Sequence, residues 1–218
     1  MIVIVSEGLF IVFEGIDGAG TTTQCNRLVS DLEERGCFVV HTREPGGTSL
    51  GERIRSLVLD PSFGEVDPVA ELLLCAASRR QHLQELIEPA LRSGKPVICD
   101  RYAASSVAYQ GAGRGLGRSA VAAANELATA GRTADLTIVL DVPVAEAEGR
   151  RNSRGHKEDR LEQAGMAFQE RAGQAYRDMA SADPEHFALI PAAGPEDEVF
   201  ASVYDSLLTR WPNFPSRL

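Results

Sequence analysis

Several features of common protein classes are missing from this chain of 218 residues. No run of eighteen apolar residues occurs, so the sequence predicts no membrane-spanning helix. The four cysteines form no C-x-x-C pair and have no histidines at metal-ligand spacing, which predicts free thiols in a reducing compartment. The apolar residues 1–5 lack the basic leader and small-residue cleavage pattern of a secretion signal. We therefore expect a cytoplasmic protein without a membrane partner.

Positive charge is also scarce, because 22 Lys and Arg face 31 Asp and Glu, giving a net charge of −9. A field of this sign repels polyanions, so we expect no polynucleotide partner, and any affinity for phosphate must come from local groups. The hydrophobic content of 44% and charged content of 24% are those of an ordinary globular protein. The length suits one well-cored domain, and we expect a single domain over residues 1–218.

Five short apolar runs alternate with longer stretches of helical periodicity. The runs are residues 10–13, 38–41, 97–99, 136–140 and 187–190. Strands that are apolar throughout suit burial on both faces, as in a parallel sheet covered by helices above and below. The sequence therefore predicts an α/β fold with a five-stranded parallel sheet flanked by helices. Ligands of such sheets bind at the carboxyl ends of the strands.

A long helix is predicted to begin near Asp67 and Pro68, with Asp67 as its cap, and to run toward Arg92. Pro89 lies within it and predicts a kink or break. Arg79 lies on the apolar face of this helix, where two interpretations are open. Its guanidinium either faces an anion or extends to solvent along its aliphatic stem.

A glycine-rich segment follows the first apolar run directly. Its residues are Gly15, Ile16, Asp17, Gly18, Ala19, Gly20, Thr21 and Thr22. The spacing matches the phosphate-binding loop G-x-x-x-x-G-K-[ST], except that Thr21 occupies the lysine position. Backbone N–H groups and the start of a helix make an anion-binding nest without the lysine, and the Thr22 hydroxyl can ligate Mg²⁺. An ordinary glycine-rich turn is the alternative for this segment taken alone.

Losing the loop ammonium has a predictable cost. Removing one donor to the transition state lowers the rate by about 10²–10³-fold in comparable cases. We therefore expect nucleotide binding to suffer less than turnover.

A basic cluster occupies residues 150–157, within a segment of few apolar residues. Such a charge run is either a solvated loop or a mobile, arginine-rich lid that closes over a transferred phosphoryl group. Composition alone does not separate the two interpretations.

Four segments, residues 13–20, 42–48, 100–111 and 158–162, together resemble the bacterial thymidylate kinases, which transfer phosphate from ATP to dTMP. The resemblance spans nearly the whole chain. It implies the single-domain fold of P-loop nucleoside monophosphate kinases, with a mobile lid at approximately residues 149–158. It also implies Mg²⁺, ATP as co-substrate, dTDP and ADP as products for dTTP synthesis, and a homodimer.

The resemblance further implies roles for individual residues. Residues 15–22 would bind ATP, with Thr22 and Asp17 as metal-binding residues, directly or through water. The expected substrate-binding residues are Arg43, Arg79, Arg101, Ser106, Tyr109 and Gln110. Arg79 and Arg101 would hold the dTMP phosphate through guanidinium forks, and Tyr109 would guard the 2′ side of the sugar. The expected catalytic residues are Asp17, Arg101 and Arg154.

Glycine at position 18 resembles family members that carry the catalytic arginine in the lid rather than in the loop. Arg150, Arg151 and Arg154 are therefore lid candidates, and Arg154 is our choice. Cys75 stands where the family pattern has a phenylalanine that stacks on thymine. Base stacking of this kind contributes about 1–3 kcal/mol, part of which the neighbouring Leu74 or the thiol would recover.

Two alternatives to an active dTMP kinase stay open. The departure at Thr21 suggests a nucleotide-binding protein with strongly reduced kinase activity, and the same fold also suits a kinase for a different nucleoside monophosphate. A compensating cation from Arg43 or from the lid would keep the dTMP kinase active.

Overall fold

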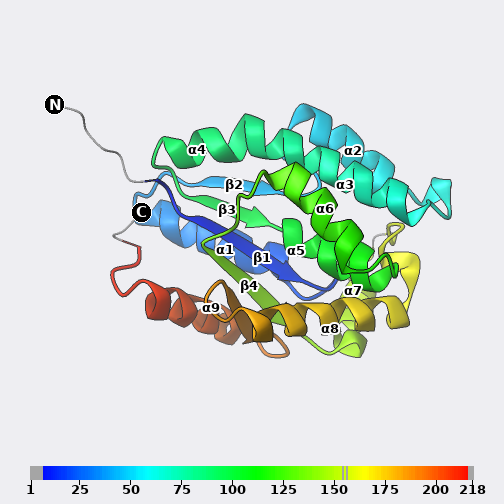
Figure 1. Ribbon diagram of the computed structural model, residues 1–218. Coiled ribbons are helices and arrows are strands. Elements are labelled where there is room, and N and C mark those ends of the chain that lie inside the picture. The colour runs from blue at the N-terminus through cyan, green and yellow to red at the C-terminus, as the bar shows by residue number, and fades with distance from the viewer. Residues whose placement is uncertain (1–6, 154, 156, 216–218) are drawn as a thin grey trace.

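The computed structural model describes residues 7–153, 155 and 157–215, and in it all five predicted strands form one parallel sheet (Figure 1). The strands are β1 (Phe10–Gly15), β2 (Val40–Arg43), β3 (Val97–Asp100), β4 (Leu136–Asp141) and β5 (Phe187–Pro191). Their order is β2-β3-β1-β4-β5. The predicted α/β class, strand number and parallel direction are thereby confirmed.

The sheet is buried on both faces, as runs that are apolar throughout predict. Phe10 and Val12 of β1 pack in a cluster with Leu83, Ile87 and Leu91, while Ile11 and Phe13 pack in another with Leu28 and Leu32. Because side chains alternate along a strand, one strand thus supplies the core on each side.

Helices connect the strands and cover the sheet (Figure 1). They are α1 (Thr21–Glu34), α2 (Ser49–Leu59), α3 (Pro68–His82), α4 (Glu88–Arg92), α5 (Ala103–Ser106), α6 (Arg118–Thr129), α7 (Val144–Ser153), α8 (Met166–Ala182) and α9 (Glu196–Arg210). Single turns of 3₁₀ helix lie at η1 (Pro61–Phe63) and η4 (Glu162–Ala164), and π-helical turns at η2 (Leu83–Ile87) and η3 (Val107–Gly113). Among the described residues no helix is both long and apolar enough to cross a bilayer.

Two sequence predictions differ in detail from the structure. β2 begins at Val40 rather than at residue 38. The first hydrogen bond toward β3 is the one that the Val40 N–H donates to the Pro96 carbonyl at 2.9 Å. Phe38, two residues earlier, is 85% exposed. The long helix does begin at Pro68, and Asp67 caps it by accepting from the Val69 and Ala70 N–H groups. It does not break at Pro89.

The irregularity near Pro89 is instead the π-helical turn η2, which ends two residues before it. Proline lacks an N–H and its ring crowds the carbonyl four residues back, so a regular α-helical turn is disfavoured there. The Glu88 N–H donates to the Leu83 carbonyl, five residues back, and the helix continues as α4 to Arg92. The predicted irregularity is therefore a wider turn just before Pro89, through which the helix continues.

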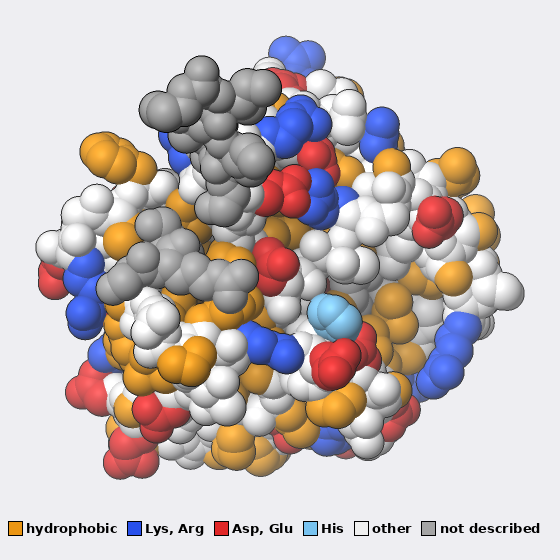
Figure 2. Space-filling view, turned by 60° about the vertical axis from the view of Figure 1, so that its left-hand side comes forward, with side chains coloured by type: hydrophobic (Ala, Val, Ile, Leu, Met, Phe, Trp, Pro, Cys, Tyr) orange, Lys and Arg blue, Asp and Glu red, His pale blue; other side chains and the backbone are white. Residues whose placement is uncertain are grey.

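The carboxyl ends of β1, β2 and β3 bring three of the singled-out segments to one edge of the sheet, at the right of Figure 1. The opposite end of the molecule comes forward in Figure 2, where acidic and basic side chains are mixed with apolar ones. The candidate functional residues of these three segments therefore lie at the carboxyl edge of the sheet.

Candidate functional site

The glycine-rich segment forms a tight loop between β1 and α1. Gly18 and Gly20 have φ of 93° and 96°, which favours glycine, and a Cβ on Gly18 would clash with the Ala147 carbonyl of α7. Helix α1 begins at Thr21, and no side chain of the described residues caps it. Its first N–H groups and the positive end of its dipole therefore remain available to an anion that binds in the loop.

The two threonines after the loop differ in their surroundings. Thr21 is buried, with 6% of its surface exposed, whereas Thr22 is exposed and donates from Oγ1 to Asp100 Oδ2 at 2.5 Å. The other oxygen, Asp100 Oδ1, is buried and has no partner among the described residues. A hydroxyl beside a carboxylate with a free oxygen is a donor set that suits Mg²⁺, which prefers hard oxygen ligands and keeps several waters.

Asp17 and Arg101 form an ion pair next to the loop. Arg101 Nη2 donates to Asp17 Oδ1 at 2.9 Å, and Nη1 donates to the Gly15 carbonyl at 2.7 Å. Gln169 Nε2 donates to the other carboxylate oxygen, Asp17 Oδ2, at 2.9 Å. Both oxygens of Asp17 are therefore occupied by protein donors. Despite burial, neighbouring Tyr109 and Asp17 keep the pKa of Arg101 well above its usual value, so its charge is permanent.

Buried Glu14 holds the backbone around Arg101, whose φ of 75° is unusual for a residue other than glycine. The Glu14 carboxylate accepts from the Tyr102 N–H at 2.9 Å and the Ser105 N–H at 3.0 Å, and from the Tyr176 hydroxyl at 2.7 Å. Burial raises the pKa of Glu14. The carboxylate thus fixes the segment after β3, and with it the direction of the Arg101 side chain.

Arg79 does not extend to solvent, because only 2% of it is exposed. Four of its N–H groups donate within the protein: to Glu44 Oε2 at 2.8 Å, Ser106 Oγ at 3.1 Å, Asn125 Oδ1 at 2.7 Å and the Tyr102 carbonyl at 3.0 Å. The interpretation that its guanidinium faces an anion is the one that the structure supports. The anion within the chain is Glu44.

A histidine one turn after Arg79 shares the same carboxylate. His82 Nδ1 lies 3.0 Å from Glu44 Oε1, and Nε2 lies 2.7 Å from the Thr42 hydroxyl. Thr42, Glu44 and His82 are all buried. A neutral imidazole that donates from Nδ1 and accepts at Nε2 satisfies every one of these groups.

A cavity opens in front of these arginines. Five of the six predicted substrate-binding residues line it: Arg79, Arg101, Ser106, Tyr109 and Gln110. Asp17, Asp159 and Cys75 line it as well. Burial raises the pKa of the Cys75 thiol to about 12, so this side chain is neutral.

Arg43 is the predicted substrate-binding residue that the structure does not place in this cavity. It pairs with Glu52 at 2.7 Å and about half of its side chain is exposed. Arg55 of α2 lines the cavity instead and donates to the Pro45 carbonyl at 3.0 Å. Burial, with the charges of Arg43 and Arg101, lowers the pKa of Arg55. Sequence reasoning missed Arg55, which lies in a helix without a recognisable motif.

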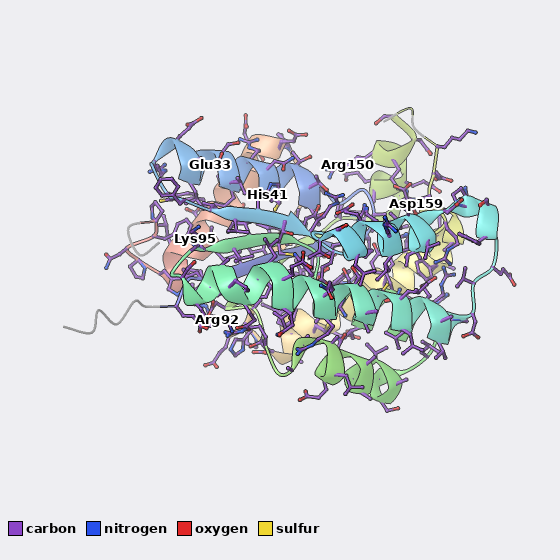
Figure 3. The ribbon with its side chains drawn as sticks, turned by 90° about the horizontal axis from the view of Figure 1, so that it is seen from above. Glu33, His41, Arg92, Lys95, Arg150 and Asp159 are labelled. Carbon is purple, nitrogen blue, oxygen red and sulfur yellow. The ribbon has the colours of Figure 1, made fainter. Side chains whose placement is uncertain are left out.

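A second cavity lies on the other side of the loop, between the loop, α7 and the start of α9. Gly18, Gly20, Arg150 and Gly194 are among its lining residues. Arg150 Nη2 donates to the Ala192 carbonyl at 2.8 Å. The glycine loop therefore separates two cavities, an arrangement that can hold two ligands with phosphates meeting at the loop. Figure 3 shows Arg150 and Asp159 at the end of the molecule where the strands have their carboxyl ends, far from Arg92 and Lys95.

The basic cluster of residues 150–157 is in part helical, since Arg150 and Arg151 belong to the last turns of α7. Arg151 is 5% exposed, and its Nη1 donates to the Asp17 carbonyl of the loop at 2.6 Å. Arg154, our choice from the sequence, lies outside the described residues, and the closing motion expected of residues 149–158 stays a prediction.

The segment after the basic cluster is anchored to α2 and α3. Arg160 is buried, donates to the Val58 carbonyl at 2.9 Å and pairs with Glu71 at 2.7 Å. Glu71 also accepts from Gln110 Nε2 at 2.8 Å. Arg160 and Gln110 are thereby linked through one carboxylate, so the chain downstream of the lid orients a side chain of the first cavity.

The family model for thymidylate kinase matches residues 13–203. The thymidylate kinase of Deinococcus radiodurans is 47% identical over 205 residues, covering 94% of this chain and 98% of that protein. That of Lacticaseibacillus casei is 45% identical over 208 residues, covering 94% and 97%. The crystal structure of thymidylate kinase from Ehrlichia chaffeensis matches with a TM-score of 0.74 at 33% identity, covering 92% of this chain and 99% of that one.

Proposed function

The chain belongs to the thymidylate kinase family, and we propose that it transfers the γ-phosphoryl group of ATP to dTMP, forming dTDP and ADP for dTTP synthesis. One observation carries the assignment of the two substrates. The glycine loop lies between a cavity lined by Arg79 and Arg101 and a cavity lined by Gly18, Gly20 and Arg150.

The first cavity is assigned to dTMP. We assign the phosphate of the nucleotide to Arg101, whose charge is permanent, and to Arg79, because both arginines line this cavity. Ser106, Tyr109 and Gln110 are assigned to the thymidine part. Glu71 holds the Gln110 amide, so that its carbonyl oxygen is free to accept from a base N–H. Arg43, which pairs with Glu52 outside this cavity, keeps only a peripheral role in the proposal.

The second cavity and residues 15–22 are assigned to ATP. The backbone N–H groups of the loop and the positive end of α1 would hold the β- and γ-phosphates. Arg150 lines the cavity between α7 and the Ala192 carbonyl, where a purine ring would pack against its guanidinium plane. We retain residues 149–158 as the lid.

Mg²⁺ is assigned to Thr22 and Asp100. Asp100 replaces Asp17 as the carboxylate ligand, because both Asp17 oxygens accept from protein donors, whereas Asp100 Oδ1 has no partner in the described part of the chain. Asp17 acts through its ion pair, by holding Arg101 beside the loop. When bound, the metal ion would neutralise charge on the β- and γ-phosphates.

The reaction needs no covalent enzyme intermediate. An oxygen of the dTMP phosphate attacks the γ-phosphorus in line, the bond from that phosphorus to the β,γ-bridging oxygen breaks, and ADP leaves with the electron pair. The phosphate of dTMP is largely ionised at neutral pH, so no general base is required. Positioning and electrostatic stabilisation by the loop and the arginines account for catalysis.

The comparisons give no support to the two alternatives, a protein of strongly reduced activity and a kinase for another nucleoside monophosphate. A steady-state coupled assay of ADP formation with ATP, Mg²⁺ and dTMP tests the proposal, with dUMP, dCMP and UMP as competing acceptors. We expect turnover that depends on dTMP and exceeds that with the other three. Equal turnover with all four would remove the thymidine assignment, and none with dTMP would remove the proposed function.

We also propose a cytoplasmic homodimer. All four cysteines are free thiols, which supports a reducing compartment. Helices α3 and α6 lie side by side (Figure 1) and expose Val69, Leu73 and Leu127, the last at 80%. An apolar face of this kind favours association of two copies. Light scattering after size-exclusion chromatography should give twice the chain mass, and Leu73→Glu with Leu127→Glu should give a monomer.

A further inference from the structure

The loop of this chain lacks a lysine, and the residue in its place contributes no charge. Thr21 is 6% exposed, and its Cγ2 lies 3.3 Å from the position that a Cβ on Gly15 would take. The short side chain therefore packs into the loop. A lysine at this position would have followed the β- and γ-phosphates as a mobile point charge.

Helix α7 brings another cation onto the same loop. It packs so closely that a Cβ on Gly18 would clash with the Ala147 carbonyl, and its last turn carries Arg151. Arg151 Nη1 donates to the carbonyl of Asp17, which lies between Gly15 and Gly18 of the loop, at 2.6 Å. This bond fixes the guanidinium on the backbone that separates the two cavities.

The guanidinium of Arg151 is incompletely satisfied within the described residues. Only 5% of the surface of Arg151 is exposed. Its buried Nε–H group has no acceptor among the residues that the structure describes. A buried charged donor without a partner is costly, so the arrangement calls for an anion. The neighbouring Arg150 differs, because its Nη2 already donates to Glu146 at 2.5 Å and to the Ala192 carbonyl.

We propose that Arg151 supplies the positive charge that the loop lacks at Thr21, and that its anion is the terminal phosphate of the bound nucleoside triphosphate. The proposal rests on the proposed function and deepens it. Arg151 differs from a loop lysine in being held by the loop backbone. The phosphates therefore meet a preorganised donor, which is the arrangement that stabilises a transition state most effectively.

A cycle of two substitutions tests this directly. Arg151→Ala should lower kcat/KM for ATP by about 10²–10³-fold, the cost of losing one donor to the transition state. Thr21→Lys should change the wild-type rate little, because the charge is already present. In the Arg151→Ala background, Thr21→Lys should raise kcat/KM by at least about tenfold, which corresponds to roughly 1.4 kcal/mol.

Two results would overturn the proposal. One is a full rate for Arg151→Ala, and the other is the same gain from Thr21→Lys in both backgrounds. Arg92→Ala, at the far end of the molecule (Figure 3), is the matched control for deleting an arginine and should match the wild type. If Arg151→Ala does not fold by circular dichroism, Arg151→Gln takes its place in the cycle. This variant keeps a polar side chain that can donate to the Asp17 carbonyl but loses the charge, and the same rescue is expected.

Calorimetric binding separates failure of this proposal from failure of the proposed function. AMP-PNP with Mg²⁺ should bind at least about tenfold more weakly to Arg151→Ala than to the wild type, and AMP and dTMP should bind equally to both. Loss of AMP-PNP affinity in a protein that does not phosphorylate dTMP would leave Arg151 as a phosphate-binding residue and refute only the proposed function. Unchanged AMP-PNP affinity in an active kinase would refute only the role of Arg151.

Discussion

Arg101 Nη2 lies 2.9 Å from Asp17 Oδ1, and this ion pair joins the segment after β3 to the glycine loop. About 18% of each side chain is exposed, so the pair borders the first cavity without being open to bulk solvent. The same guanidinium also donates to the Gly15 carbonyl. One arginine thus contacts both the loop and the cavity assigned to dTMP.

Arg101→Ala should therefore abolish transfer while leaving ATP binding nearly intact. The substitution removes a permanent charge from the phosphate of dTMP, and we expect kcat/KM for dTMP to fall by at least about 10²–10³-fold. The loop loses two contacts with Arg101, at the Gly15 carbonyl and the Asp17 carboxylate, but keeps the backbone N–H groups and the start of α1 that would hold ATP. Coupled turnover gives the first quantity and AMP-PNP calorimetry the second. Undiminished turnover would refute the role assigned to Arg101.

His82 should act as a positioning residue for Arg79. Its imidazole hydrogen-bonds one carboxylate oxygen of Glu44, and Arg79 donates to the other. The carboxylate therefore holds Arg79 in place only when both donors are present. In His82→Leu, Glu44 loses one buried partner, an effect worth about 1–3 kcal/mol. We expect KM for dTMP to rise about tenfold or more with kcat changed far less.

The conservative variant His82→Gln separates positioning from packing. Its amide can donate to Glu44, so it should recover most of the dTMP affinity, whereas a purely structural role would leave both variants equally impaired in kcat and KM. Thr42→Val, which removes the partner of Nε2, should give a weaker effect of the same kind. A kcat defect without a change in KM would contradict the assignment.

The sequence predicted those parts of the fold and site that local patterns encode. The apolar runs predicted the strands, because burial on both faces leaves no polar alternation. The spacing of Gly15, Gly20 and Thr22 predicted the loop, and Asp67 before Pro68 predicted the helix start. Arg79 could be singled out because a guanidinium on an apolar helix face needs a partner.

The parts that sequence reasoning missed depend on contacts between distant segments. Glu44 is 35 residues from Arg79, and Gln169 is 152 residues from Asp17. The sequence does not predict that Asp100 approaches Thr22, since this contact follows from β3 lying next to β1. A local pattern does not determine such pairings, because they arise from strand order and helix packing.

Cys75 should limit how firmly the base of dTMP is held. Its small thiol lines the first cavity, so Cys75→Phe would place an aromatic ring where a base can stack. Stacking contributes about 1–3 kcal/mol, and we expect KM for dTMP to fall by about five- to a hundredfold if the cavity admits the ring. Cys75→Ser, which keeps the size, is the control. A higher KM in Cys75→Phe with unchanged ATP kinetics would mean that the thiol position contacts the base too closely for an aromatic ring.

Glu14 should make stability depend on pH in a defined direction. Burial raises its pKa in the folded protein above the ordinary value of 4.5, so the folded state binds the proton more strongly than the unfolded state. The resulting stabilisation is fully present below pH 4.5 and is lost as pH rises through the folded pKa. Relative to the wild type, Glu14→Gln should therefore gain stability as pH rises above that value.

Urea unfolding of both proteins between about pH 4.5 and 8 measures this difference in the free energy of unfolding. The exposed Glu126→Gln serves as the control and should show no such trend. A difference between the wild type and Glu14→Gln that stays constant over this range would show that the Glu14 proton is not linked to folding.

The assignment of Mg²⁺ to Asp100 rather than Asp17 gives opposite expectations for two neutral substitutions. Asp100→Asn removes the charge from the carboxylate that accepts from Thr22 and has a free buried oxygen, so the Mg²⁺ concentration for half-maximal rate should rise about tenfold or more. Asp17→Asn removes the partner of Arg101 but no proposed ligand. It should raise KM for dTMP and leave the Mg²⁺ requirement unchanged.

Titrating Mg²⁺ at saturating ATP and dTMP distinguishes the two assignments of the metal ligand. Thr22→Ser keeps the hydroxyl and is expected to retain the wild-type Mg²⁺ requirement. If Asp17→Asn shifts the Mg²⁺ dependence and Asp100→Asn does not, the ligand is Asp17, and its ion pair with Arg101 must open when the metal binds.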